Sequence, residues 1–230
     1  YISFVYIALV GRFVYADNID TTQDINSRKI SGSLNIGNTN DAIVNLYGEN
    51  NIKDYFSIAT CGGTSSKCTK PELKAEANIK DSATVGASVT IIGDAAKGVL
   101  TIDNSSKLYT QQLWVSGNDN DIDFKGNDDS NGELLINNKS AVYVVSSQND
   151  SPFKTDNISW NNDIVTRGNN ITGATVGTGD LILGKTGNGV IKVQDSSALN
   201  VSHDLIVSTG VDGAPNTKAS TIDITNNSNV

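Results

Sequence analysis

The chain repeats one short phrase at irregular intervals, and this repetition constrains the fold more than any other feature. Gly98 opens GVLTIDNSSKLYTQQLWVSG, Gly132 opens GELLINNKSAVYVVSS, and Gly189 opens GVIKVQDSSALNVSHDLIVSTG. Ala77 begins a shorter variant, ANIKDSATVGASVTIIG, and Ser220 begins STIDITNNSNV. Each copy holds a strand, a polar corner of Asn, Asp and Ser, and a second strand. Repeats at variable spacing are typical of a solenoid, whose loops vary while its stacked rungs are kept.

Apolar and polar residues alternate with period two in short runs, such as 42–46 (AIVNL), 88–92 (SVTII) and 180–183 (DLIL). This pattern predicts an all-β chain of stacked parallel strands. Asn and Ser at equivalent corners can form hydrogen-bonded ladders. At about 20–25 residues per rung, roughly nine or ten rungs would fit. The best helix candidate is the short segment 71–77 (PELKAEA).

The composition supports an elongated shape and excludes two classes of partner. Hydrophobic residues make up 37% of the chain and aromatic residues only 6%, which suits a thin core better than a spherical one. The formal net charge is −8. Nucleic acids and anionic membranes both require a basic face, so neither is expected as a partner.

Residues 1–16 (YISFVYIALVGRFVYA) differ from the rest and are interpreted as the remnant of a signal peptide. The apolar run 2–10 is shorter than the roughly 20 residues of a membrane-spanning helix. Val14 and Ala16 suit the −3 and −1 positions of a signal-peptidase site. Arg12 interrupts the apolar region, and the alternative is a buried first strand or helix. Export is the favoured interpretation.

Cys61 and Cys68 flank the flexible sequence GGTSSK and are predicted to form a disulfide in an exported chain. Free thiols are the alternative. A zinc site would need more ligands than two cysteines and a single histidine supply. We therefore expect a stapled surface loop in this region.

The phrases GVLTIDNSSKLYT and GVIKVQDSSALNVSHDLIVSTG resemble the passenger repeats of autotransporters, including pertactin-like and self-associating adhesins. The resemblance covers 75–230 well and 30–51 loosely. It implies a right-handed parallel β-helix, export through the periplasm, and an outer-membrane β-barrel downstream. The expected organisation is a signal-peptide remnant at 1–16, an irregular N-terminal capping region with the disulfide loop at 17–74, and passenger repeats at 75–230.

Catalytic chemistry finds little support, and no cofactor or metal site is expected. No serine lies in Gly-x-Ser-x-Gly, and His203, the only histidine, falls at a corner where it reads as a solvated residue. The dense acidic cluster consists of Asp119, Asp121, Asp123, Asp128 and Asp129. It is interpreted as a solubilising loop, with an adventitious Ca²⁺ site or the acidic site of a glycan-active β-helix enzyme as alternatives.

Segments 117–132, 146–157 and 161–173 are expected to project as loops, where binding functions concentrate. The acidic cluster and Trp160 are therefore the candidate ligand contacts, although Trp160 could equally be packed. Trp114 is expected to be buried, with an outward position as the alternative. The resemblance implies a non-enzymatic cell-surface or secreted module for adhesion or self-association. Its partner would be a host-cell surface, a glycan or another copy. The alternatives are a toxin-type passenger, a glycan-active enzyme and a structural spacer.

Overall fold

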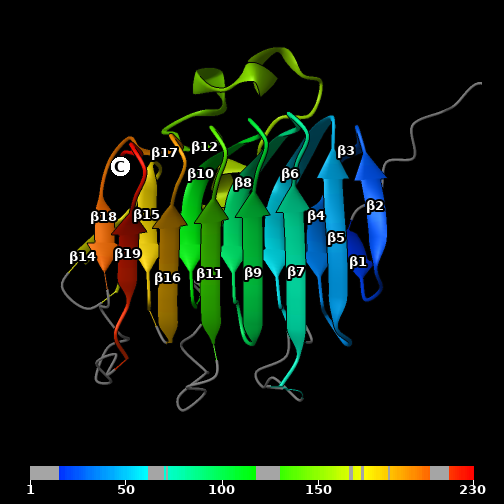
Figure 1. Ribbon diagram of the computed structural model, residues 1–230. Helices are drawn as coiled ribbons and strands as arrows, with labels where there is room; N and C mark the ends of the chain where they lie inside the picture. The colour runs from blue at the N-terminus through cyan, green and yellow to red at the C-terminus, as the bar shows by residue number, and fades with distance from the viewer. Residues whose placement is uncertain are drawn as a thin grey trace, which may run out of the picture.

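A computed structural model describes residues 16–61, 70, 72–117, 130–165, 168–171, 174–185, 187–207 and 218–230. The described chain is all-β, and most of its strands lie in two parallel sheets (Figure 1). This part of the prediction is confirmed. The chain passes from one sheet to the other and back, and each passage stacks on the one before, an arrangement that fits a β-solenoid. In the described residues, the larger sheet, with ten strands, is called sheet A, and the sheet with seven strands is called sheet B. A repeat is one strand of sheet B together with the strands of sheet A that follow it.

Sheet B has seven strands in the described residues, and all neighbours in it are parallel. Its strands are β2 (Gln23–Asn26), β5 (Ala42–Tyr47), β7 (Lys74–Ile79), β9 (Lys97–Ile102), β11 (Asn131–Ile136), β16 (Asn188–Val193) and β19 (Thr221–Ile224). In every pair of neighbours, the later strand in sequence lies further along the same direction of the stack.

Sheet A is formed by the strands that alternate with those of sheet B. They are β1 (Ala16–Ile19), β3 (Lys29–Ile30), β4 (Ser33–Ile36), β6 (Glu49–Ile58), β8 (Thr84–Ile92), β10 (Lys107–Val115), β12 (Ala141–Val144), β15 (Asp180–Leu183), β17 (Ala198–Val201) and β18 (Leu205–Val207). The first half of β10 pairs with β12 and its second half with β15, so the sheet continues along two rows of shorter strands. A separate antiparallel hairpin joins β13 (Gly168–Ile171) to β14 (Ala174–Val176).

The strand register confirms the alignment of the repeated phrases. Gly132 pairs with Gly98 on one side and with Gly189 on the other. The partner of Gly98 on its other side is Ala75, so the shorter upstream variant begins two residues earlier than its phrase suggested. The interval between paired residues is 23 from Lys74 to Lys97 but larger elsewhere.

The expected nine or ten rungs are wrong for the described part of the chain, where sheet B has seven strands. Paired positions are 34 residues apart between β9 and β11, at 97 and 131, and 57 apart between β11 and β16, at 131 and 188. Long insertions between strands therefore leave fewer residues for further rungs than a regular spacing of about 20–25 residues would.

The core is a narrow layer of aliphatic side chains between the sheets. Leu46, Ile79, Ile102, Ile136 and Val193 form one continuous row along the stack, and each is fully buried. Fully burying such a side chain contributes about 1.5–3 kcal/mol. Since no strand can bury its row alone, stacking of successive repeats is what makes the core possible.

The glycine that opens the phrase is required by close approach of the backbone. A Cβ atom on Gly98 would lie 2.4 Å from the backbone nitrogen of Gly93, and one on Gly132 would lie 2.3 Å from the carbonyl oxygen of Ile92. At Gly189 the Cβ would meet a leucine methyl at 2.4 Å. Glycine at this position therefore lets the chain turn tightly out of sheet A into sheet B.

The polar corner between sheets B and A forms a serine ladder, as expected from the repeats. Ala83 N donates to Ser106 Oγ at 3.1 Å, and Ser106 N donates to Ser140 Oγ at 3.2 Å. Ser140 N then donates to Ser197 Oγ, and Ser197 N to Ser228 Oγ, both at 3.2 Å. Each hydroxyl satisfies a backbone donor of the preceding repeat, so buried corners carry no unpaired N–H at these positions.

Two consecutive residues at the same corner adopt the left-handed conformation. The pairs are Asp81–Ser82, Asn104–Ser105, Asn138–Lys139, Asp195–Ser196 and Asn226–Asn227, all with φ between 51° and 62°. Asn and Asp tolerate this region better than most residues because their side chains bond locally. The Nδ2 groups of Asn138 and Asn226 also donate to Asp103 and Asp195 of the preceding repeat, at 2.6 and 2.9 Å.

The structure differs from the expected organisation upstream of residue 75. Segment 17–74 was expected to be an irregular capping region, but its residues 17–58 contribute strands to both sheets, and these strands pair directly with those of the later repeats. Segment 71–77, the helix candidate, places Lys74 and the residues after it in β7. The alternating burial of β7, with Ala75, Ala77 and Ile79 inward, overrides the local helix propensity. Residues 1–15 of the predicted signal peptide lie outside the described residues, and Ala16 begins β1.

Candidate functional site

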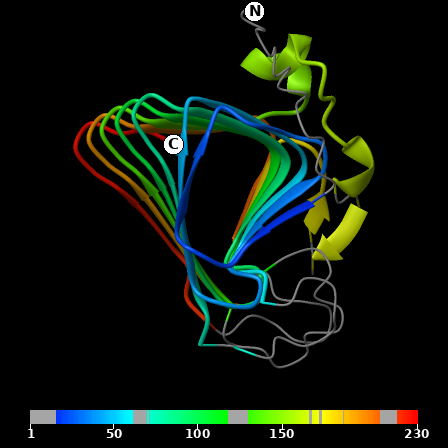
Figure 2. The ribbon, with the colours of Figure 1, turned by 90° about the vertical axis from the view of Figure 1, so that its right-hand side faces the viewer.

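Residues 146–165, which we call the strap, lie along the outer side of sheet A, away from sheet B (Figure 2). The strap contains three short 3-10 helices, η2 (Gln148–Asp150), η3 (Pro152–Thr155) and η4 (Asn162–Ile164). Segments 117–132, 146–157 and 161–173 were expected to project as loops; that prediction is wrong for residues 146–157 and 161–165, which lie on sheet A, whereas residues 118–129 lie outside the described residues. The physical reason is that the strap carries two large aromatic side chains, Phe153 and Trp160. Burying them against the sheet is more favourable than leaving them exposed to water.

Trp160 is 5% exposed, so it is not the exposed stacking platform that was one of its two expected roles. Its ring packs with Phe153 at a centroid distance of 6.2 Å. Beneath them lies Gly86 of β8, where an added Cβ would fall 2.4 Å from two carbons of the Phe153 ring. The stacked pair Tyr109 and Tyr143 borders the same cluster.

Buried polar side chains of sheet A hold the strap by hydrogen bonds. Asn51 Oδ1 accepts from Trp160 Nε1 at 2.8 Å, and Asn51 Nδ2 donates to Asp156 Oδ2 at 2.7 Å. Ser88 Oγ accepts from the backbone N–H of Asn161 at 2.7 Å. Asn51 and Ser88 are 1% and 0% exposed. Since buried polar groups without partners are costly, these positions favour the docked strap.

Lys29 Nζ also forms an ion pair with Asp156. Partial burial works to raise the pKa of Asp156, but the hydrogen bonds from Lys29 and Asn51 outweigh it. The pKa of this carboxyl is therefore held below its ordinary value of 3.8. The segment that follows β12 is thus tied to Lys29 of β3 and Asn51 of β6, two early strands of sheet A.

Trp114 faces outward from sheet A and is nevertheless buried, with 1% of its surface exposed. Val165 and Val176 cover it, and its Nε1 donates to Gln112 Oε1 at 3.0 Å. The ammonium of Lys185 lies 5.3 Å from the ring centroid, within cation–π range. The expected burial of Trp114 is confirmed, although on the outer side of the sheet.

Several other predicted site residues lie outside the residues that the structure describes. The acidic cluster Asp119, Asp121, Asp123, Asp128 and Asp129 lies outside the described residues. Cys61 is disulfide-bonded, and Cys68, the other cysteine of the chain, also lies outside them. In the part of the chain that the structure describes, no helix is long and apolar enough to cross a membrane.

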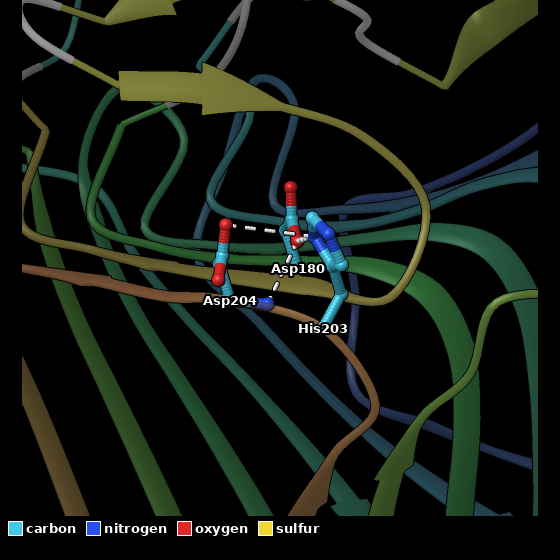
Figure 3. Close-up of side chains that lie close together, drawn as sticks. All are labelled: Asp180, His203 and Asp204. Carbon is cyan, nitrogen blue, oxygen red and sulfur yellow. Dashed lines mark hydrogen bonds and ion pairs between the residues drawn. The ribbon is translucent and has the colours of Figure 1, made fainter.

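The described residues bring together one cluster of ionisable side chains, Asp180, His203 and Asp204 (Figure 3). Asp180 is the first residue of β15, and the other two lie in the turn between β17 and β18. Because β15 and β18 are parallel neighbours, that turn lies beside the start of β15. His203 Nδ1 is 2.6 Å from Asp180 Oδ1 and 3.6 Å from Asp204 Oδ2.

Asp180 is fully buried and is held by the backbone. Gly177 N donates to its Oδ2 at 2.5 Å, and Asp204 N donates to its Oδ1 at 2.9 Å. His203 is more exposed, with 60% of its side chain accessible. The hydrogen bond with Asp180, together with the charges of Asp180 and Asp204, raises the pKa of His203 above 6.5. The site therefore places an accessible imidazole over a fixed, buried carboxylate.

The corner position predicted for His203 is confirmed, but its role as a merely solvated residue is corrected by the contact with Asp180. Sequence reasoning missed Asp180 because Gly-Thr-Gly-Asp reads only as a tight corner before a strand. The signal in the sequence was an acid, Asp180, directly before the apolar run 181–183. Ser202, the serine adjacent to His203, pairs with Ser146 Oγ at 3.0 Å.

The fold and site define an all-β protein of two parallel sheets built from sequence repeats, with a strap over one sheet and a His–Asp corner. The chain is similar to a protein of Escherichia coli K12 described as "Uncharacterized protein YuaO", with 59% identity over 221 residues. The match covers 96% of this chain but only 13% of YuaO, so the chain spans a small part of that relative. No protein-family model matches the chain, and no solved structure matches it.

Proposed function

We propose that the chain is part of the right-handed parallel β-helix passenger of an autotransporter, carried through the periplasm and displayed on the outer surface or released. The stacked parallel strands and the repeated corner phrases support this architecture. The disulfide of Cys61 suits an oxidising compartment outside the cytoplasm. The similarity to a small part of a much longer protein suits a passenger with an outer-membrane barrel downstream.

We propose that the passenger acts without catalysis, by adhesion or self-association through the outer face of sheet B. The observation that carries this proposal is the contrast between the two sheets. The strap covers the outer side of the middle strands of sheet A, around β8, β10 and β12, whereas outward residues of sheet B are accessible along the stack. Ile43 is 40% exposed, and Val99, Leu135 and Val190 are partly exposed on the same face.

This face combines apolar contact area with paired charges. Val99, Glu133 and Val190 lie in register across three neighbouring strands. Lys192 Nζ bonds Glu133 Oε1 at 2.8 Å. A flat surface of partly exposed β-branched and charged side chains suits a broad contact with a host-cell surface, a glycan or another copy of the chain.

The test introduces charge into the centre of this face. The double variant Val99→Lys/Leu135→Lys should lose attachment to cells and self-association, the latter measured by sedimentation velocity. Asn149→Lys, which adds one positive charge at an exposed position of the strap, is the control and should behave as wild type. Circular dichroism establishes that both variants fold. A folded double variant that attaches and associates like wild type would contradict the proposal.

A further inference from the structure

The cluster of Asp180, His203 and Asp204 contains one contact that the histidine–carboxylate pair does not explain. His203 Nδ1 already has a partner in Asp180 Oδ1 at 2.6 Å. Asp204 Oδ2 also faces Nδ1, but at 3.6 Å it lies beyond hydrogen-bond distance. The carboxylate of Asp204 therefore lies beside His203 Nδ1, which already bonds Asp180. The negative charge of Asp204 adds to that of the buried Asp180.

We propose that Asp180, His203 and Asp204 bind one divalent transition-metal ion of the zinc class. The ligand atoms are Asp180 Oδ1, His203 Nδ1 and Asp204 Oδ2, which lie within 4.8 Å of one another. Ligands bound at about 2.0–2.2 Å in tetrahedral geometry are separated by about 3.4 Å. His203 Nδ1 lies 2.6 Å from Asp180 Oδ1 and 3.6 Å from Asp204 Oδ2, so a small movement of the accessible His203 and Asp204 side chains around the fixed Asp180 would let an ion take the place of the proton between His203 and Asp180.

The chemistry of the three donors selects the class of ion. A neutral imidazole with two carboxylates carries two negative charges, which a divalent cation balances. Imidazole favours zinc, copper, nickel and cobalt, whereas calcium and magnesium prefer sites made of oxygen ligands alone. The accessible side of His203 leaves room for water as a further ligand, as in zinc sites with three protein ligands.

The surroundings of Asp180 orient it for this role. Its Oδ2 is fixed by Gly177 N and its Oδ1 by Asp204 N, so the carboxylate cannot turn away. Hydrogen bonds of this kind hold metal-binding carboxylates in position. The ion would join the start of β15 to the turn before β18, and would thereby fasten two neighbouring repeats.

The experiment titrates zinc chloride into the untagged, metal-free chain by isothermal calorimetry and compares Asp204→Asn with wild type. Asp204→Asn removes the third ligand but keeps the backbone N–H that Asp180 accepts. Loss of a residue that only orients a ligand weakens metal binding about 10–100-fold, so loss of Asp204 should weaken one zinc site by about 10-fold or more. Asp163→Asn, an exposed acid of the strap, is the matched control and should leave that site unchanged.

A second readout separates metal ligation from nonspecific attraction. Cobalt(II) bound to wild type should give visible absorption bands of a low-symmetry site, and His203→Gln should lose them while remaining folded by circular dichroism. Excess calcium should not displace the cobalt. The proposal is overturned if wild type binds no zinc, if Asp204→Asn binds it as wild type does, if Asp163→Asn loses the same site, or if calcium competes equally.

Discussion

Trp160 Nε1 donates a hydrogen bond of 2.8 Å to Asn51 Oδ1, a residue 109 positions earlier in the chain. The same amide donates to Asp156 at 2.7 Å. One side chain of an early strand thus fixes both an aromatic residue and an acid of the strap. Since Asn51 and Trp160 are 1% and 5% exposed, water cannot readily replace either partner.

Replacing Asn51 by Ala should lower the free energy of unfolding by about 1–3 kcal/mol, because it leaves the Trp160 N–H buried without its acceptor. Urea denaturation followed by tryptophan fluorescence measures this change. Asn149→Ala, at an exposed position of the strap, should leave stability unchanged. Equal stabilities of the two variants would show that the strap is not anchored through Asn51.

Substituting Gly86 should displace the strap. A Cβ would lie 2.4 Å from ring carbons of Phe153 and 2.8 Å from Trp160, which forces the aromatic pair to move. We expect Gly86→Ala to cost about 1–3 kcal/mol, as overpacking commonly does, and to expose the strap to limited proteolysis. In Gly177→Ala the new Cβ would meet only Asp180 Oδ2 at 3.9 Å, so this control should resist cleavage as wild type does. Unaltered cleavage in Gly86→Ala would contradict the packing.

Acid should weaken the anchoring of the strap through Asp156. Its pKa is lower in the folded chain than the ordinary 3.8, so its contribution to stability is present above that value and disappears as pH falls through the folded pKa. Asp156→Asn should therefore be less stable than wild type at neutral pH, with the difference shrinking below pH 3.8. Unfolding midpoints across this range measure it. A difference that does not change with pH would argue against the ion pair with Lys29.

The serine ladder predicts that removing one of its hydroxyl groups lowers the stability of the chain. Ser140→Ala removes one of the two acceptors of the buried Ser106 N–H, which also donates to the carbonyl oxygen of Asp103 at 3.3 Å, and should destabilise the chain by about 0.5–1.5 kcal/mol. Thr101→Val removes a hydroxyl from the accessible face of β9 and is the comparison. Calorimetric melting of the two variants distinguishes them. Similar melting temperatures would mean that the Asp103 carbonyl alone satisfies the Ser106 N–H, and would contradict a stabilising role of the serine ladder.

The strands and their stacking could be predicted because the repeated phrase records them directly. Gly98, Gly132 and Gly189 open equivalent phrases, and the register places them opposite one another. The alternation also holds in β9, where Leu100 and Ile102 are buried in the core and Val99 and Thr101 are partly exposed. The number of repeats could not be predicted, because nothing in a strand indicates how long an insertion follows it.

The strap and the His–Asp corner could not be predicted because both depend on contacts between distant residues. Segment 146–165 is polar and contains a proline, so it reads as an exposed loop, and only its contacts with Asn51 and Gly86 make it a covering layer. Likewise, His203 meets Asp180 only because β15 and β18 are neighbours. The local sequence pattern therefore gives little information about contacts between residues that are far apart in the chain.

The strap also limits how rods of this kind could assemble. A molecule with adhesive surfaces on two opposite sides can add neighbours without end, whereas one with a single open side forms a pair and then stops, because both adhesive surfaces are used. With Trp160 and Phe153 covering the middle of the outer side of sheet A, contacts through sheet B alone would give closed pairs in place of growing fibres. A segment that sequence reads as a loose loop would then set the size of the assembly.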